Sequence, residues 1–330
     1  MKRKILLSAL LYSAMFGICQ AQIVPDATEE VVTSTDVQPF NQNVSTFIDP
    51  NGNIYNAGGT TNGGGFLDLA ISKIIPDGTI EWSKNYAGVW GGNSFFSKVI
   101  YDGNSSTVIA VGTRYSGSSD KNDIAIYVHD NYGNYINHKI INSNHSLDDG
   151  AMDVVVDENG NYYLCGISDN SNGSDIIIIK LDANLAIEWD IYANFNGMLD
   201  GAHHIVYNID EQTVTIGGGT QTSLNTYRYL TLTYDLNGNL VEDHFSNYNH
   251  TFIDRITAIA KDNAGNIYAC GASFDGSKFS AHTIKLDTLL NVEWETFHNA
   301  SPAINDFNTC LAVDGSGNVY TGGFYNTTME

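Results

Sequence analysis

Residues 157–166 read Asp-Glu-Asn-Gly-Asn-Tyr-Tyr-Leu-Cys-Gly, and this ten-residue phrase recurs along the chain. The consensus Asp-x-x-Gly-Asn-x-Tyr-x-x-Gly has further copies at 49–58, 262–271 and 314–323, and degenerate copies that end at Gly112 and Gly217. Successive closing glycines, from Gly58 to Gly323, are 54, 54, 51, 54 and 52 residues apart. A repeat of about fifty residues predicts a solenoid, a propeller or an array.

The third copy shows how one repeat is built. Apolar stretches at Met152–Val156, Tyr162–Ile167, Ile176–Ile179 and Ala186–Tyr192 are separated by turns and a polar loop. In these turns the Asp side chain bonds back to the local backbone, and Gly or Asn tolerates a positive φ. Such turns join adjacent antiparallel strands. One repeat therefore predicts four short strands, and no stretch is left for a helix.

The strands of the repeat do not alternate between apolar and polar residues. Ile176–Ile179 is four isoleucines and Val154–Val156 is three valines, so both faces of these strands must be covered. A β-propeller covers both faces, because each four-stranded blade packs between its neighbours. We predict an all-β fold, a β-propeller of about six four-stranded antiparallel blades, with Trp82, Trp189 and Trp294 as packing anchors between blades. The repeats span approximately 41–93, 94–148, 149–199, 200–253, 254–305 and, in part, 306–330.

The last repeat predicts only two strands, at about Thr309–Val313 and Asn318–Phe324, so the last blade is incomplete. An uncovered blade edge is a liability that proteins usually cover. The N-terminal segment 22–40 contains a candidate closing strand, Ala27–Thr33, which precedes its repeat by the same offset as the fourth strands of intact repeats. Two interpretations stay open: this strand closes a six-bladed ring, or the chain belongs to a longer protein.

Residues 1–21 are predicted to be a secretory signal peptide. Lys2, Arg3 and Lys4 precede an apolar run to Ile18, and Cys19-Gln20-Ala21 offers a small-residue cleavage site. The run is too short to span a bilayer comfortably, and no later stretch predicts a membrane helix. We expect an exported protein, located outside the cell or at its surface, with the periplasm as an alternative; lipidation of Cys19 is disfavoured by Ile18 directly before it.

The chain is strongly acidic, with a formal net charge of −22. This charge disfavours nucleic acid and anionic membranes as partners. Cys165, Cys270 and Cys310 follow the predicted cleavage site, and an odd number of cysteines does not predict a disulfide framework. We expect these cysteines to be buried thiols, with a Cys270–Cys310 bridge as the alternative. We expect the protein to be a monomer or part of a longer modular chain.

The phrase Asp-x-x-Gly-Asn-x-Tyr-x-x-Gly, followed by a polar loop, Asp-Ile-x-x-x-Lys and a Trp strand, resembles the SBBP-type bacterial β-propeller repeats. Residues 175–180 with Trp189, and residues 68–73 with Trp82, match best. The resemblance implies a secreted or surface module, and the composition is similar to that of Bacteroidetes proteins. The paired glycines Gly58-Gly59 and Gly322-Gly323 are similar, more weakly, to kelch repeats.

A recurring acidic residue marks the start of the predicted innermost strands. Asp149, Asp254 and Asp306 stand eight residues before a turn Asp, and Asp200 takes the equivalent place in the fourth repeat. These four carboxylates could form a partial ring that binds a divalent cation such as calcium. The alternative, which we favour, is that each carboxylate accepts backbone N–H bonds and fixes the loop entry, with no cofactor.

Aromatic residues in the loops between strands are the candidate ligand contacts. Trp90 lies in a Gly-flanked loop between blades, where it could stack on a sugar ring or anchor a protein partner. The full candidate set is Trp90, Phe95, Phe96, Tyr115, Tyr227 and Phe274.

Signals for catalysis are weak. The nine histidines show no metal-ligand spacing, and neither a Gly-x-Ser-x-Gly elbow nor a phosphate loop is present. We therefore expect a non-catalytic binding module for a protein or glycan ligand. The alternatives are a propeller-type glycoside hydrolase or lyase, with an acid pair that the sequence does not identify, and a structural spacer in a longer surface protein.

Overall fold

The computed structural model describes residues 42–62, 64–88, 91–117, 121–143, 147–195, 199–223, 226–246, 254–299 and 305–326. The predicted signal peptide and the candidate closing strand Ala27–Thr33 lie outside these residues. The described residues form 22 strands and contain no helix, which confirms the all-β prediction.

The strands form five four-stranded sheets and one two-stranded sheet, each of which is one blade or part of one. The first three blades comprise β1 (Gln42–Ile48), β2 (Ile54–Thr61), β3 (Leu67–Ile74), β4 (Ile80–Tyr86), β5 (Phe95–Asp102), β6 (Thr107–Gly117), β7 (Lys121–Asp130), β8 (Tyr135–Ile141), β9 (Asp149–Val156), β10 (Tyr162–Asn170), β11 (Gly173–Leu181) and β12 (Ile187–Ala193). The remaining strands are β13 (Asp200–Asn208), β14 (Thr213–Ser223), β15 (Thr226–Asp235), β16 (Leu240–Phe245), β17 (Asp254–Lys261), β18 (Ile267–Phe274), β19 (Phe279–Leu286), β20 (Val292–His298), β21 (Asn305–Val313) and β22 (Val319–Asn326).

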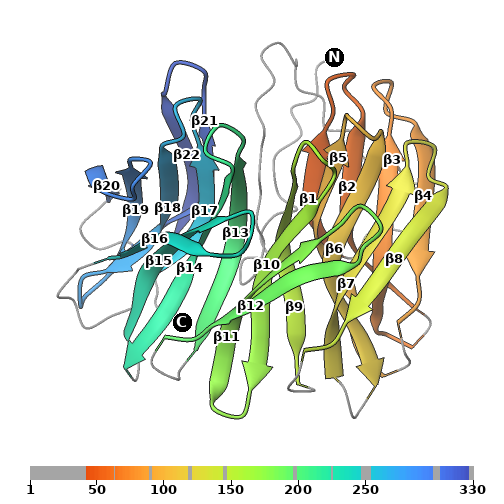
Figure 1. Ribbon diagram of the computed structural model, residues 1–330, viewed down its shortest axis with the longest axis horizontal. Helices are drawn as coiled ribbons and strands as arrows, with labels where there is room; N and C mark the ends of the chain where they lie inside the picture. The colour runs from red at the N-terminus through yellow and green to blue at the C-terminus, as the bar shows by residue number, and fades with distance from the viewer. Residues whose placement is uncertain are drawn as a thin grey trace.

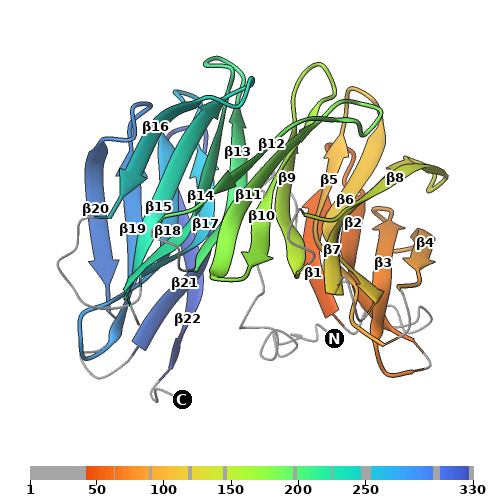
Figure 2. The same cartoon turned by 60° about the horizontal axis from the view of Figure 1, so that its bottom comes forward.

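Each blade is an antiparallel meander in which strands pair in chain order. The blades follow one another around an arc, with β1–β4 at one end and β21–β22 at the other (Figures 1 and 2). Because neighbouring strands run in opposite directions, the turns after the first and third strands lie at one end of each blade. We call this end the turn face. The connections after the second and fourth strands lie at the other end, the loop face.

The four isoleucines of β11 show why both faces of a blade are apolar. Ile177 and Ile179 belong to the cluster shared with the second blade, whereas Ile176 and Ile178 belong to the cluster shared with the fourth blade. All four side chains are at most 1% exposed. Successive side chains of a strand point to opposite faces, so an unbroken apolar run fills the core on both sides of one sheet.

The repeated phrase is a hydrogen-bonding unit at the turn face. Asp157 Oδ1 accepts bonds of 2.9 Å from the backbone N–H of both Asn159 and Asn161. Its Oδ2 accepts bonds from Asn161 Nδ2 at 2.8 Å and from the Tyr163 hydroxyl at 3.1 Å. Gly160 supplies the positive φ of 80° that the turn requires. The same pattern of four bonds recurs at Asp49, Asp262 and Asp314.

The closing glycine of the phrase is required by a bulge in the first strand of each blade. A Cβ placed on Gly166 would lie 1.9 Å from the Gly150 carbonyl oxygen. In the fourth blade the equivalent position is Gly218, whose Cβ would lie 2.0 Å from Gly201 O, and not Gly217 as the sequence spacing indicated. Gly217 and Gly218 are adjacent, so the sequence does not show which of them faces the Gly201 carbonyl. The position of the bulge in β13 decides that it is Gly218.

Within the described residues the sixth sheet contains only β21 and β22, as the sequence predicts. Cys165, Cys270 and Cys310 are free thiols, and Cys270 Sγ lies 3.6 Å from the Cys310 carbonyl oxygen, so the alternative Cys270–Cys310 bridge is wrong. The described part of the chain has no helix long and apolar enough to cross a membrane.

Candidate functional site

Tyr115, at the end of β6, is held against the loop that joins the first two blades. Its backbone N–H donates to Ser94 Oγ at 3.0 Å, and its ring covers Gly92, where an added Cβ would lie 2.3 Å from Tyr115 Cγ. The side chain is half-buried. Trp90, which the sequence singled out in the same loop, lies outside the described residues. Among the candidate aromatic residues that the structure describes, Tyr115 is the one whose ring packs on this loop.

The neighbouring candidates Phe95 and Phe96 have different environments. Phe95 is half-buried at the start of β5, on the loop face. Phe96 is fully buried in the cluster between the first two blades, and its ring packs edge-on against Tyr127 at 5.6 Å. A side chain without exposed surface cannot contact a ligand, so Phe96 is a core residue. Tyr227, near the start of β15, is half-buried.

Phe274 is one end of a continuous row of phenylalanine rings on the loop face of the last two blades. Its ring centroid lies 4.8 Å from that of Phe279, which lies 5.0 Å from Phe307; Phe307 in turn stacks on Phe324 at 5.0 Å. Phe324 is 40% exposed and the other three are half-buried. We call these four residues the aromatic row.

Sequence reasoning found Phe274 and missed the other three members of the aromatic row. Phe279 is the cross-strand partner of Phe274, and Phe307 is that of Phe324. All four residues lie near the loop-face ends of their strands. Their contact across two blades depends on how the sheets pack, which the repeat pattern does not state.

Two of the four predicted acidic residues at the loop entries, Asp149 and Asp200, accept backbone hydrogen bonds. Asp149 Oδ2 accepts from Ser143 N at 2.8 Å, and Asp200 Oδ2 accepts from Phe195 N at 2.6 Å. Asp149, Asp200 and Asp306 are at most 5% exposed. Burial raises the pKa of Asp200, partly offset by the Phe195 N–H. No group of three metal-ligating side chains occurs within the described residues, and the Asp254 side chain is not described.

A second acidic feature lies beside Asp149 on the loop face of the third blade. Burial and the nearby Asp148 raise the pKa of Asp169 above its usual value. Asp148 accepts hydrogen bonds from the backbone and side chain of Asn122, and its Oδ2 lies 3.6 Å from Lys121 Nζ. A raised pKa next to a second carboxyl group is a feature shared by catalytic carboxyl pairs.

A buried polar chain connects the first strands of three successive blades. Lys98 Nζ lies 3.1 Å from Asp153 Oδ1, and His204 Nδ1 lies 3.5 Å from Asp153 Oδ2. His204 Nε2 lies 2.5 Å from the Thr257 carbonyl of the fifth blade, so it carries a proton that it donates. Burial raises the pKa of Asp153, but Lys98 and His204 lower it further, so the carboxyl is held ionised.

These three residues occupy one register position of successive first strands, directly after the bulge. The Lys98, Asp153 and His204 side chains are at most 9% exposed, so the chain of contacts stabilises the packing of blades and is closed to a ligand. The repeat spacing places these residues at one position, but a charged or imidazole side chain does not occur there in every blade. In β1 the equivalent residue is Ser45.

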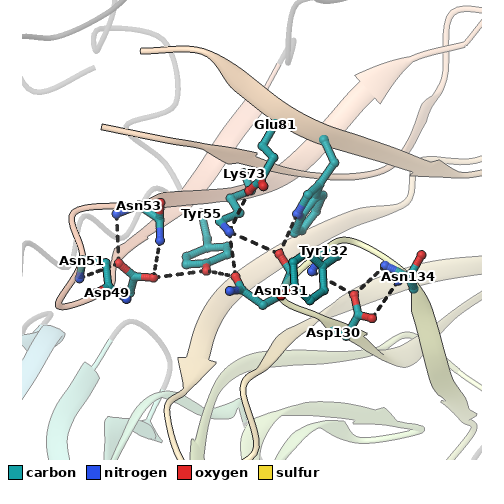
Figure 3. A network of polar contacts seen from close by, with 11 residues as sticks. Asp49, Asn51, Asn53, Tyr55, Lys73, Glu81, Asp130, Asn131, Tyr132 and Asn134 are labelled. Carbon is teal, nitrogen blue, oxygen red and sulfur yellow. Dashed lines mark hydrogen bonds and ion pairs between the residues drawn. The ribbon is translucent and has the colours of Figure 1, made fainter. Parts of the chain in front are cut away.

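At the turn face, the first and third blades each bind the next blade through a Trp and a Lys. Figure 3 shows this contact between the first and second blades. Trp82 Nε1 donates to the Asn131 carbonyl at 3.1 Å, and Lys73 Nζ donates to the same carbonyl at 3.2 Å. Lys73 also pairs with Glu81 at 2.7 Å and lies 5.8 Å from the centre of the Tyr55 ring.

The third blade repeats this arrangement with Tyr163, Lys180, Glu188 and Trp189. Trp189 Nε1 and Lys180 Nζ both donate to the Leu236 carbonyl at 3.1 Å. We call the set of Tyr, Lys, Glu and Trp the latch. In both latches the Trp donates to a main-chain carbonyl. In the first latch the side chain at that position contributes as well, because Asn131 Oδ1 accepts from Lys73 Nζ and from the Tyr55 hydroxyl, both at 2.7 Å.

The antiparallel four-stranded blades define a β-propeller. No family model and no curated protein matches the chain. It is similar to solved β-propeller structures: a periplasmic gluconolactonase of Pseudomonas aeruginosa (TM-score 0.51, 11% identity, 78% of this chain and 70% of that chain). It is also similar to a protein from Lactobacillus plantarum (TM-score 0.51, 11% identity, 87% of this chain and 85% of that chain). At this identity the similarity shows the fold alone.

Proposed function

We propose that this β-propeller is an exported, non-catalytic binding module whose ligand, a glycan or a protein, lies on the loop face. The observation that carries the proposal is the aromatic row Phe274–Phe279–Phe307–Phe324, four rings in contact that are half-buried or exposed. Aromatic rings supply large apolar contact area with few degrees of freedom, and such surfaces mark binding sites.

The charge of the chain narrows the class of ligand. A formal net charge of −22 disfavours polyanions, so a neutral glycan or a neutral or basic protein segment is the preferred ligand. Export is supported by the charged start, apolar run and small-residue cleavage site of residues 1–21. The resemblance to SBBP-type repeats is consistent with a surface or secreted module.

The test is a glycan array with the mature protein, followed by calorimetric titration of any glycan that binds. Phe324→Ser is expected to weaken binding at least tenfold. Tyr325→Ser is the matched control, because Tyr325 is 66% exposed and points to the opposite face of β22. Equal effects of the two substitutions, or no binding to any glycan of the array, would contradict the aromatic row as a glycan site.

The raised pKa of Asp169 beside Asp148 favours one second candidate, a glycoside hydrolase with Asp169 as proton donor. Turnover of a polysaccharide that is lost in Asp169→Asn and retained in Phe324→Ser would select this alternative. Loss of binding in Phe324→Ser without any turnover would select the binding module.

A further inference from the structure

The fifth blade contains a complete latch. Lys285 Nζ pairs with Glu293 at 2.7 Å and lies 5.5 Å from the centre of the Tyr268 ring. The Tyr268 and Trp294 ring centroids are 6.1 Å apart, close to the 6.4 Å and 6.0 Å of the equivalent pairs in the first and third blades. The donors of the fifth latch are therefore positioned like those that bind a turn in the other two.

Within the described residues, the fifth latch has no carbonyl acceptor for Trp294. Trp294 is 39% exposed, whereas Trp82 in a filled latch is 8% exposed. Every side chain of β20 is exposed, whereas its counterparts β4 and β12 are partly covered. The Trp294 indole N–H and the outer strand β20 are therefore exposed. In the first and third blades, a turn of the next blade covers the equivalent place.

The filled latches show what an occupant needs. The acceptor carbonyl belongs to the second residue of the turn between the third and fourth strands, and a glycine two residues later lies on the indole. A Cβ on Gly133 would lie 2.6 Å from the Trp82 ring, and one on Gly238 would lie 3.2 Å from Trp189. The turns that face blades without a Trp carry Leu185 and Leu290 at this position, with positive φ of 64° and 56°. A latch with Trp therefore requires a small residue.

One segment of the chain outside the described residues has the sequence of such a turn. Residues 24–28 read Val-Pro-Asp-Ala-Thr, and residues 75–79, which form the third-to-fourth-strand turn of the first blade, read Ile-Pro-Asp-Gly-Thr. In this alignment Pro25 takes the place of the acceptor residue and Ala27 that of the small residue.

The spacing to the next first strand agrees with this alignment. Thr28 precedes Gln42, the first residue of β1, by 14 residues (42 − 28). The five equivalent intervals range from 14 to 16 residues: they are 16 from Thr79 to Phe95 (95 − 79), 15 from Asn134 to Asp149 (149 − 134), 14 from Ala186 to Asp200 (200 − 186), 15 from Asn239 to Asp254 (254 − 239) and 14 from Asn291 to Asn305 (305 − 291). The connection therefore has the length that carries the chain from a third-to-fourth-strand turn to the next blade.

We propose that the turn of residues 24–28 docks into the latch of the fifth blade, so that Trp294 Nε1 and Lys285 Nζ donate to the Pro25 carbonyl and Ala27 lies on the indole. This contact joins the N-terminal segment to the end of the arc. It is independent of the aromatic row, which lies on the opposite, loop face, so the failure of either proposal leaves the other in place.

The experiment measures hydrogen exchange of the tryptophan indole N–H groups by NMR, on mature protein with 15N-labelled Trp transferred to D₂O. Signals are assigned with Trp82→Phe, Trp189→Phe and Trp294→Phe. We expect slow exchange of the Trp82 and Trp189 N–H groups, which are hydrogen-bonded to carbonyls, and equally slow exchange at Trp294. Ala27→Leu is expected to accelerate exchange at Trp294 at least tenfold, because the larger side chain cannot lie on the indole.

The same experiment contains its own controls. Ala27→Leu must leave exchange at Trp82 and Trp189 unchanged, which shows that the blades remain folded, and Ala27→Gly is expected to slow exchange at Trp294 further. Equal exchange at Trp294 in the parent, Ala27→Leu and Ala27→Gly proteins overturns the proposal. Protection that rises with protein concentration also overturns it, since a second copy then fills the latch. A mature N-terminus after Thr28, measured by intact mass, overturns it as well.

Discussion

Trp82 and Asn131 are 49 residues apart and belong to neighbouring blades, and the indole Nε1 of Trp82 donates a 3.1 Å hydrogen bond to the main-chain carbonyl of Asn131. Lys73 donates to the same oxygen. The carbonyl of Leu236 accepts the equivalent bond from Trp189, without the side-chain bonds that Asn131 adds in the first latch. Contact between blades thus combines apolar packing with a directional bond to a backbone turn.

Replacement of Trp82 by Phe removes this donor and keeps an aromatic ring. We expect a loss of about 1–2 kcal/mol in the free energy of unfolding, because one buried hydrogen bond and part of the packed ring are lost. Urea unfolding measures the change. Tyr132→Phe is the control, since Tyr132 is 75% exposed and should change stability by less than about 0.5 kcal/mol. Equal changes would mean that the latch does not stabilise the contact.

The turn aspartates allow a matched pair of substitutions. Asp157→Asn replaces an acceptor of four hydrogen bonds by an amide that presents a donor to Asn161 or Tyr163. We expect a loss of about 1–3 kcal/mol at Asp157, which is 3% exposed. Asp314→Asn breaks the same set of bonds at an exposed turn, where water can replace them, so its effect should be clearly smaller in the same unfolding measurement.

Gly166→Ala tests the role of the bulge. The new Cβ would lie 1.9 Å from the Gly150 carbonyl oxygen, so β9 and β10 must separate. We expect a loss of more than about 3 kcal/mol, or no soluble folded protein. The control is Gly315→Ala, where nothing lies within 4 Å of the added atom. A folded Gly166→Ala variant with parental stability would show that the strand pair can shift at no cost.

Lys98→Met leaves the buried, ionised Asp153 without its nearest cation. We expect a loss of about 3–5 kcal/mol, as is typical when one partner of a buried ion pair is removed. Lys121→Met breaks an exposed pair with Asp148, whose side chains are 49% and 41% exposed, and should change stability by less than about 1 kcal/mol. Similar results for the two lysines would contradict a buried charge chain.

His129 makes stability depend on pH. Burial, helped by Lys84, lowers the pKa of His129 to about 4, below the usual 6.5. The unfolded chain therefore binds a proton between pH 6.5 and 4 that the folded protein does not, so stability is full above about pH 6.5 and falls as the pH drops towards 4. Urea unfolding at several pH values measures this slope. His129→Gln should reduce the slope and leave the part due to His282 and His244, whose pKa values burial also lowers. An unchanged slope would assign the acid sensitivity to groups other than His129.

The exposed turn aspartates act at lower pH. Hydrogen bonds from the Asn239 side chain lower the pKa of Asp235, and those from Asn318 lower that of Asp314. A carboxyl with a lowered folded-state pKa stabilises the fold above its unfolded pKa of about 3.9, and this contribution disappears as the pH falls through the folded value. The turns therefore add to acid unfolding only below about pH 4, which separates them from His129.

Much of the fold could be predicted from local chemistry. The Asp, Gly, Asn and Tyr of the phrase contact one another within seven residues, so the turn is encoded where it forms. The run Ile176–Ile179 requires apolar surroundings on both faces, which a blade between two blades provides. Because both signals are local, the strands of the third repeat were predicted within a few residues of their observed bounds.

The site residues were less predictable, because they depend on contacts between blades. Phe96 is one residue from Phe95 yet lies in the core, since strand register turns neighbouring side chains to opposite faces. The choice of Gly218 over Gly217 depends on a bulge in β13. The Lys98–Asp153–His204 chain joins residues of three blades whose contacts no local pattern records.

The sequence by itself determined the repeat, the turns, the four-stranded blades and the propeller, because these follow from interactions over a few residues and from burial on both faces of each strand. Only the tertiary structure decided which aromatic rings meet on the loop face, which carboxylates are held by backbone N–H groups, and that the latch of Trp82 is filled while that of Trp294 has no acceptor among the described residues. Those relationships are fixed by the packing of one blade on the next, which depends on strand register, bulges and carbonyl groups of residues far apart in the chain.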